Sequence, residues 1–113
     1  MPKSTPEINV SVTFRHTEST PALMSYAIEK ITHCVTKYVG YETNAHVVLS
    51  VEKRDHIAEV QVHSKGHDAA GKAVTGDLYS AIDKVTDTVE AQLRKQKDKQ
   101  LSHQKHQGLE PEL

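Results

Sequence analysis

The sequence predicts an α+β fold: a two-layer β-α-β-β-β-α sandwich in which two helices pack on one face of a four-stranded sheet. Three runs alternate between apolar and polar residues, and two stretches repeat apolar residues every three or four positions. A strand, a helix and a second strand in one sheet require a right-handed crossover, which makes the first two strands parallel. The second helix has its own apolar stripe, so we expect both helices on the same face.

The first strand is predicted over residues 7–15, EINVSVTFR, in which apolar and polar residues alternate cleanly. Residues 1–6 contain two prolines and no pattern, and we expect them to form a flexible leader. The apolar face of the strand contains Ile8, Val10, Val12 and Phe14.

The first helix is predicted from Pro21 to about Tyr38. Thr20 can be its N-cap, and Pro21 suits the first helical position, where a missing N–H costs nothing. Gly40 is placed to terminate the helix. The main apolar stripe contains Leu23, Ala27, Ile31, Cys34 and Tyr38.

The single cysteine, Cys34, lies within that stripe and is expected to be a small buried hydrophobe. An activated thiolate needs an electropositive and accessible setting, which an apolar stripe does not suggest. One cysteine cannot form an internal disulfide, and this agrees with a reducing compartment.

Two alternating runs, 45–52 and 57–65, are joined by the tight turn KRDH and predict a hairpin. Residues 69–75, AAGKAVT, predict a weaker fourth strand, because small residues have little strand propensity. The other face of the sheet is polar enough to stay in water, with Asn9, Ser11, Thr13, Ser50, Glu52, Glu59, Gln61 and His63.

The second helix is predicted over residues 77–99, with Asp77 as its cap and with Leu78, Ile82, Val85, Val89 and Leu93 on one stripe. A second line of residues on the flank of this helix, here called the flank line, can face a partner or can simply be solvated. The flank line contains Lys84, Thr88, Ala91 and Lys95. Residues 100–113 lose the period and gain Gln, His, Gly and Pro, so we expect a disordered C-terminal tail. The predicted strands and helices therefore indicate a single domain over residues 7–99.

The chain carries 14 basic and 15 acidic residues, for a net charge of −1, so bulk charge does not point to nucleic acid, and no DNA partner is expected. An anionic partner would have to be met by a local patch, such as the four basic residues in 94–99. No run of 18 apolar residues exists, and the opening MPKSTPEINV lacks the apolar core of a signal peptide. We therefore expect a soluble cytoplasmic protein without a membrane partner.

Neither a metal site nor catalysis is expected. His63 and His67 straddle a turn, and His103 and His106 can share a helical face, but no Cys pair or HExxH spacing accompanies these histidines. The chain has no Gly-rich phosphate loop and no nucleophile elbow, and its acids are spread over helix flanks. No cofactor is predicted, and the protein is not expected to be an enzyme.

Two motifs carry a resemblance to a known family: VVLSVEK at 47–53 and DLYSAID at 77–83. Together with the element order, they resemble the short ribosome hibernation-promoting factors, a family also labelled ribosome-associated inhibitor and sigma-54 modulation protein. The second helix of that family closes with a Lys-rich end, which KQKDK at 95–99 resembles. The likeness covers roughly residues 8–99.

The resemblance implies a factor that binds the decoding region of the small ribosomal subunit, across the path of messenger and transfer RNA. Such a factor inhibits translation during stress or stationary phase. Its partners would be the small subunit and the 70S ribosome through 16S ribosomal RNA, and we expect a monomer when it is free. Basic residues on two helices can meet the phosphates of folded RNA at fixed spacing. The RNA-binding residues that the family implies are Lys30, His33, Lys37, Lys84, Arg94, Lys95, Lys97 and Lys99.

The chain departs from the family at four positions where relatives are usually basic: Met24, His33, Thr88 and Ala91. We therefore expect weaker ribosome binding that is sensitive to salt or pH, with His33 supplying charge only when protonated. The alternative is a divergent member that regulates a different RNA or a protein partner. The chain lacks the second domain of the long family members, so the short hibernation-promoting type is favoured. The sequence leaves open whether the protein promotes or blocks ribosome pairing.

Overall fold

The computed structural model describes residues 7–109, with side chains described except at position 67 and from 98 onward. The predicted element order is confirmed. The elements are β1 (Ile8–Arg15), α1 (Pro21–Tyr38), β2 (Thr43–Glu52), β3 (Asp55–Ser64), β4 (His67–Thr75) and α2 (Leu78–Leu109).

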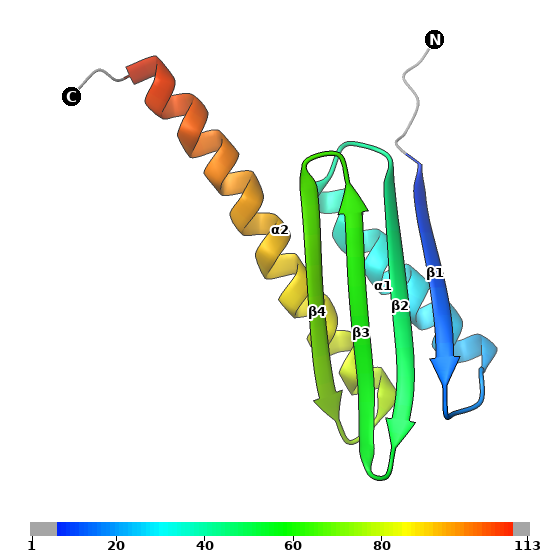
Figure 1. The fold of residues 1–113 in the computed structure, drawn as a ribbon. Helices are drawn as coiled ribbons and strands as arrows, with labels where there is room; N and C mark the ends of the chain where they lie inside the picture. The colour runs from blue at the N-terminus through cyan, green and yellow to red at the C-terminus, as the bar shows by residue number, and fades with distance from the viewer. Residues whose placement is uncertain (1–6, 110–113) are drawn as a thin grey trace.

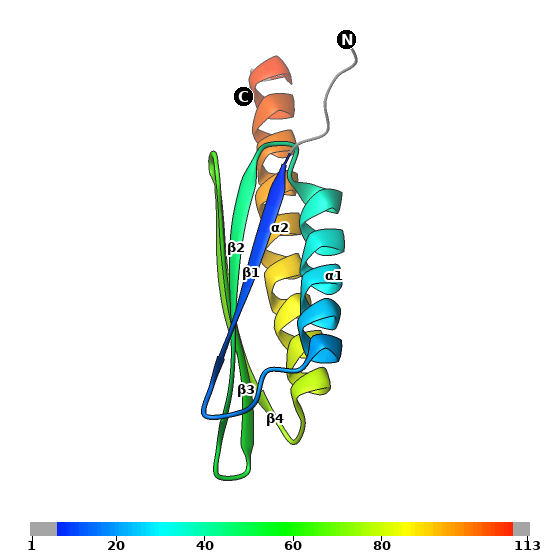
Figure 2. The same cartoon turned by 90° about the vertical axis from the view of Figure 1, so that its right-hand side faces the viewer.

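The four strands form one sheet in the order β1-β2-β3-β4. β1 is parallel to β2, with Ile8 opposite Thr43, while β2, β3 and β4 are successively antiparallel. Both helices lie on the same face of this sheet, as Figures 1 and 2 show. The predicted two-layer sandwich is thus confirmed, and one face of the sheet stays open.

The two helix starts are capped as the sequence predicts. Thr20 accepts a hydrogen bond from the Leu23 N–H at 3.1 Å, and α1 begins at Pro21. Asp77 accepts bonds from the Ser80 N–H at 2.9 Å and from the Ser80 hydroxyl at 2.8 Å. These two bonds hold the pKa of Asp77 below its usual range.

The end of α1 differs from the prediction. Its C-cap is Val39 in an extended conformation, with φ −122°, and its N–H donates to the Val35 carbonyl at 2.8 Å. Gly40 has no positive φ and therefore does not close the helix in the left-handed conformation. The prediction that Gly40 terminates α1 is wrong, because the chain turns straight from the helix into an extended segment.

The core lies between the sheet and the two helices. Ile31, Leu49 and Ile82 are among its largest buried side chains, each no more than 1% exposed. Cys34 is 3% exposed, and burial raises the pKa of its thiol to about 11. The prediction that Cys34 is a buried hydrophobe is confirmed.

α2 packs closely over β4 and closes the outer edge of that strand. The Gln92 side chain accepts from the Ala70 N–H at 2.9 Å and donates to the Ala70 carbonyl at 2.6 Å. The Gln96 amide donates to the Asp68 carbonyl at 2.7 Å. A Cβ at Gly71 would lie 3.1 Å from the Thr88 methyl group, so the small residues of β4 allow this close approach.

The second helix is longer than predicted. α2 continues to Leu109, ten residues beyond Lys99, through much of the segment predicted as a disordered tail. Residues 100–109 contain no proline, and Gln, Leu and Lys are good helix formers, so the helix continues after its apolar stripe ends. Residues 1–6 and 110–113, which belong to the predicted leader and tail, lie outside the described residues.

Candidate functional site

The predicted basic residues lie on the helix layer. Lys30, His33 and Lys37, here called the α1 basic line, lie on α1. Lys30 and Lys37 reach carboxylates of α2, and His33 and Lys37 are exposed. Figure 2 shows α1 and α2 side by side on the same face of the sheet. On α2 the exposed cations with described side chains are Lys84, Arg94, Lys95 and Lys97; the Lys99 side chain lies outside the described residues.

Lys30 lies against a carboxylate of the other helix. Its Nζ is 3.4 Å from Asp83 Oδ1, and the Tyr26 hydroxyl donates to the same oxygen at 2.6 Å. This hydrogen bond raises the pKa of Tyr26. Asp83 therefore joins α1 to α2.

Lys37 has a matching arrangement two helical turns farther along. Its Nζ is 3.0 Å from Glu90 Oε2, and the Tyr38 hydroxyl donates to that oxygen at 2.9 Å. The bonds from Lys37 and Tyr38 lower the pKa of Glu90, and the bond to Glu90 raises the pKa of Lys37. Two of the three residues of the α1 basic line are thus partly neutralised by α2.

Sequence reasoning missed this pairing. A signal was present, because Asp83 and Glu90 are seven residues apart and therefore share one face of α2, as Lys30 and Lys37 share one face of α1. The matching spacing predicts a contact only when the two helices are known to lie side by side.

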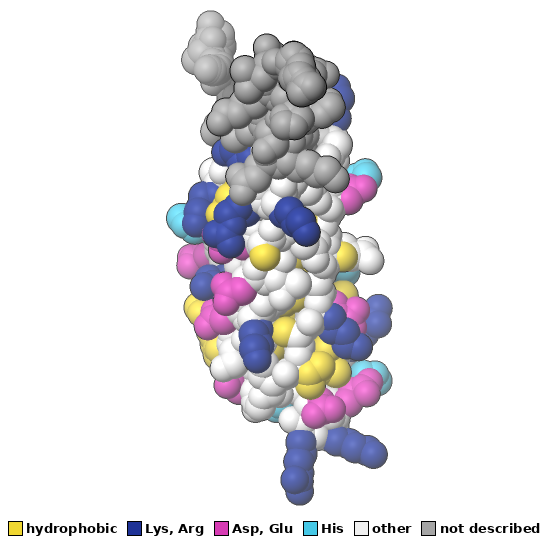
Figure 3. Space-filling model, turned by 90° about the vertical axis from the view of Figure 1, so that its left-hand side faces the viewer, with side chains coloured by type: hydrophobic (Ala, Val, Ile, Leu, Met, Phe, Trp, Pro, Cys, Tyr) yellow, Lys and Arg dark blue, Asp and Glu magenta, His cyan; other side chains and the backbone are white. Residues whose placement is uncertain are grey.

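The flank line of α2 has no charged side chain at its centre. Thr88 and Ala91 are exposed between Lys84 and Lys95, and the Thr88 hydroxyl donates back to the Lys84 carbonyl at 3.2 Å. Figure 3 shows Lys and Arg side chains on this side of the molecule separated by uncharged and acidic ones. Within the part of the chain with described side chains, none of Lys84, Arg94, Lys95 or Lys97 forms an ion pair.

Tyr79, in the motif at 77–83, contacts α1. Its ring is 42% exposed and packs edge-to-face on Tyr26 of α1, with ring centres 5.1 Å apart. Tyr79, Tyr26 and Asp83 thus form one contact between the helices.

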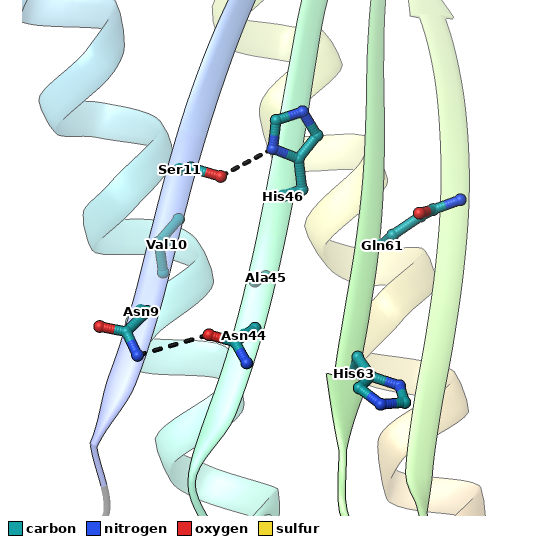
Figure 4. A pocket seen from close by; sticks show the side chains of 8 residues that line it. All are labelled: Asn9, Val10, Ser11, Asn44, Ala45, His46, Gln61 and His63. Carbon is teal, nitrogen blue, oxygen red and sulfur yellow. Dashed lines mark hydrogen bonds between the residues drawn. The ribbon is translucent and has the colours of Figure 1, made fainter.

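The open face of the sheet carries a shallow hollow of about 410 Å³ over β1, β2 and β3 (Figure 4). The His46 ring lies 2.7 Å from the Ser11 hydroxyl and 3.3 Å from the Thr13 hydroxyl. His63 binds Asp68 at 2.8 Å. Of the predicted open-face residues, Ser50 is only 9% exposed, because Arg15 and Ile57 flank it in the sheet.

Neither a metal centre nor a membrane helix emerges from residues 7–109. Among the residues whose side chains are described, no three His, Cys, Asp or Glu side chains gather into a group that could hold a metal ion. Within the same part of the chain, no helix is both long and apolar enough to span a membrane.

Comparison with known proteins gives a consistent result. The family model described as Sigma 54 modulation protein / S30EA ribosomal protein matches residues 10–101. A ribosome hibernation promoting factor of Pseudomonas putida is 33% identical over 95 residues, covering 84% of this chain and 92% of that protein. The protein of the same name from Escherichia coli K12 is 31% identical over 96 residues, covering 85% and 100%.

Solved structures agree on the fold. The N-terminal domain of Protein Y from Thermus thermophilus has a TM-score of 0.70 and 31% identity, covering 79% of this chain and 97% of that one. A ribosomal subunit interface protein from Coxiella burnetii has a TM-score of 0.68 at 21% identity, covering 77% and 94%, which shows the fold alone. Because the family model and the relatives span most of its length, the chain belongs to the Sigma 54 modulation protein / S30EA ribosomal protein family.

Proposed function

We propose that this protein is a ribosome hibernation factor that binds the small subunit in its decoding region and inhibits translation during stress or stationary phase. The observation that carries the proposal is the likeness, over 84% or more of the chain, to proteins named ribosome hibernation promoting factor. Occupying the path of messenger and transfer RNA requires binding without catalysis. A role on the ribosome also implies a place in the cytoplasm.

The helix layer supports the proposal. Two adjacent helices on a rigid sheet present cations at fixed spacing, which suits the phosphates and 2′-hydroxyls of 16S ribosomal RNA. The exposed cations of α2 without an ion pair among the described side chains, Lys84, Arg94, Lys95 and Lys97, are the ones best placed to meet phosphates. Lys30 and Lys37 would first have to leave Asp83 and Glu90, and His33 would contribute when protonated.

The test is co-sedimentation of the purified protein with 30S subunits and 70S ribosomes in sucrose gradients, at low and at moderate salt. We expect stoichiometric binding that weakens as salt rises, because phosphate contacts release counterions. The double variant Lys84→Ala/Lys95→Ala should lose this binding.

A matched control removes two cations from the sheet side of the molecule. Arg54 lies in the β2–β3 turn and Lys72 lies on the open face of β4, and both are exposed. The variant Arg54→Ala/Lys72→Ala has the same net charge as the helix variant and should still bind. Equal losses in both variants would mean that only bulk charge matters, which would contradict a binding face on the helices.

One observation favours a second candidate function, a regulator of another RNA or of a protein with weak ribosome affinity. Asp83 and Glu90 form ion pairs with two of the helix lysines. Thr88 and Ala91 leave the flank line uncharged at its centre. Absence of binding to 30S subunits at low salt would favour this second function.

A further inference from the structure

Tyr41, in the connection between α1 and β2, presents an aromatic ring to solvent. It is 53% exposed, the largest fraction among the exposed large hydrophobic side chains, ahead of Val74 at 49% and Tyr79 at 42%. Tyr41 lines two hollows, described below, whose other lining residues include several basic side chains.

Two buried hydroxyl groups hold the backbone at Tyr41 and at the next residue, Glu42. The Thr43 hydroxyl donates to the Tyr41 carbonyl at 2.8 Å, and Thr43 is 0% exposed. The Ser64 hydroxyl donates to the Glu42 carbonyl at 2.9 Å, and Ser64 is 5% exposed. An exposed ring on an anchored loop loses little conformational entropy when a flat ligand stacks on it.

Two open hollows meet at Tyr41. One, of about 490 Å³, lies at the end of α1 and includes Lys37, Tyr38 and Lys97 in its lining. The other, of about 440 Å³, lies toward the β3–β4 turn and includes His63 and Lys65. Both are lined by Tyr41, at the end of the sheet where the α1–β2 connection and the β3–β4 turn lie side by side (Figure 1).

The charges around the ring favour an anion on both sides. Lys97 is exposed and forms no ion pair among the described side chains, while Lys37 shares its charge with Glu90 but keeps half of its side chain exposed. Lys65 lies on the other side, together with one acid, Glu42. The C-terminal end of α1 carries partial negative charge, which Lys37 and Lys97 offset.

An aromatic ring flanked by cations is the arrangement that binds single-stranded nucleic acid, in which bases stack on the ring and phosphates meet the cations. Duplex RNA does not fit this chemistry, because its bases are stacked on each other and paired. We propose that unpaired RNA nucleotides cross this end of the molecule, with one base stacked on Tyr41 and its neighbouring phosphates held by Lys37, Lys97 and Lys65. The proposal rests on the proposed ribosomal function and adds to the helix cations a contact for a single-stranded segment of RNA.

Tryptophan fluorescence provides a direct test, since the natural chain contains no tryptophan. The variant Tyr41→Trp introduces one fluorophore at the proposed site, and the control variant Tyr79→Trp introduces one at the far end of the helix layer. Each variant is titrated with an oligoadenylate RNA of about six nucleotides, a length within the usual site size. The RNA should quench the fluorescence of Tyr41→Trp and leave that of Tyr79→Trp unchanged. A blunt RNA duplex should quench neither variant.

A second measurement uses the natural ring. With a labelled oligoadenylate, Tyr41→Ala should weaken binding about 5- to 150-fold, and Tyr41→Phe should keep it, because stacking needs the ring and not the hydroxyl. Thermal unfolding of Tyr41→Ala shows whether the fold is retained.

Any of three results with RNA would overturn the proposal: no quenching of Tyr41→Trp by the single strand, equal quenching of Tyr79→Trp, or the same response to duplex and single strand. A spectral shift of Tyr41→Trp caused only by ribosomal proteins freed of RNA would also overturn it and would indicate a protein partner instead.

The two proposals fail separately. If Tyr41→Trp does not respond to the oligonucleotide while Lys84→Ala/Lys95→Ala still abolishes binding to 30S subunits, the Tyr41 site is wrong and the ribosomal function stands. If the fluorescence of Tyr41→Trp is quenched but the protein does not bind 30S subunits, the single-strand site stands and the ribosomal function is wrong.

Discussion

Two carboxylates between the helices each bind one lysine and one tyrosine of α1. Asp83 holds Lys30 and Tyr26, and Glu90 holds Lys37 and Tyr38. These contacts fix α1 against α2, but they also reduce the positive charge that the helix layer presents to a phosphate. Each acid therefore stabilises the fold but weakens the proposed RNA binding.

Glu90→Gln should separate the two effects. Glu90 is 26% exposed and has a lowered pKa, so it stabilises the fold above its ordinary pKa near 4.5, and the stabilisation is lost as pH falls through the lowered value. We expect the variant to be less stable by about 1 kcal/mol or less at pH 7, a difference that shrinks below about pH 4.5. Thermal unfolding between pH 3 and 7 measures this.

The same variant should bind 30S subunits more tightly at low salt, because Lys37 is then released from a carboxylate. Glu59→Gln, on the open face, removes the same charge far from the helices and serves as the control. If Glu90→Gln binds no better than Glu59→Gln, Lys37 does not contact RNA. A stability difference that persists unchanged below pH 4 would contradict the ionic role of Glu90.

At the scale of the elements, α2 covers the outer edge of β4. The outer groups of β4 at Ala70 and Asp68 are bound by side chains of Gln92 and Gln96, so α2 replaces a neighbouring strand there. The low strand propensity of β4 is offset by this packing, because its small residues let the helix approach. The sequence alone predicts the weak strand but not its cover.

Gln92→Ala should therefore destabilise the protein by about 0.5–1.5 kcal/mol, because the Ala70 N–H and carbonyl lose their side-chain partner. Gln61→Ala, on the open face and without a side-chain hydrogen bond among the described residues, should stay within about 0.5 kcal/mol of the natural chain. Chemical unfolding of both variants gives the comparison. Equal stability of the two would mean that water satisfies the β4 edge as well as Gln92 does.

At the scale of the whole molecule, sequence patterning predicts most of the architecture. The 2.0 and 3.6 periods locate the strands and helices, and the crossover rule makes β1 and β2 parallel, because these features depend on local geometry and apolar burial. The contacts of Asp83, Glu90 and Gln92 are not predictable this way, since they join segments far apart in the chain. The end of α2 is missed for another reason: helix propensity continues through residues 100–109 after the apolar stripe has ended.

Thr88→Lys/Ala91→Arg tests whether the whole helix layer acts as one electrostatic surface. Both residues are exposed on α2, and Lys and Arg are good helix formers, although the Lys stem must turn past Gly71. Filling the centre of the flank line should tighten binding to 30S subunits at low salt. It should also steepen the log–log salt dependence by about 0.7 to 0.9 for each new phosphate contact.

The matched control adds the same two charges to the open face, as Gln61→Lys/Val74→Arg, at two exposed positions. If the bound RNA meets the helices, only the helix variant gains affinity and slope when the comparison is repeated at physiological salt, where screening limits charge effects to within about 8 Å. A gain in both variants would indicate nonspecific attraction to ribosomal RNA. No gain in either would mean that the uncharged centre of the flank line lies outside the contact, and that any binding depends on the cations at its two ends and on the Tyr41 site.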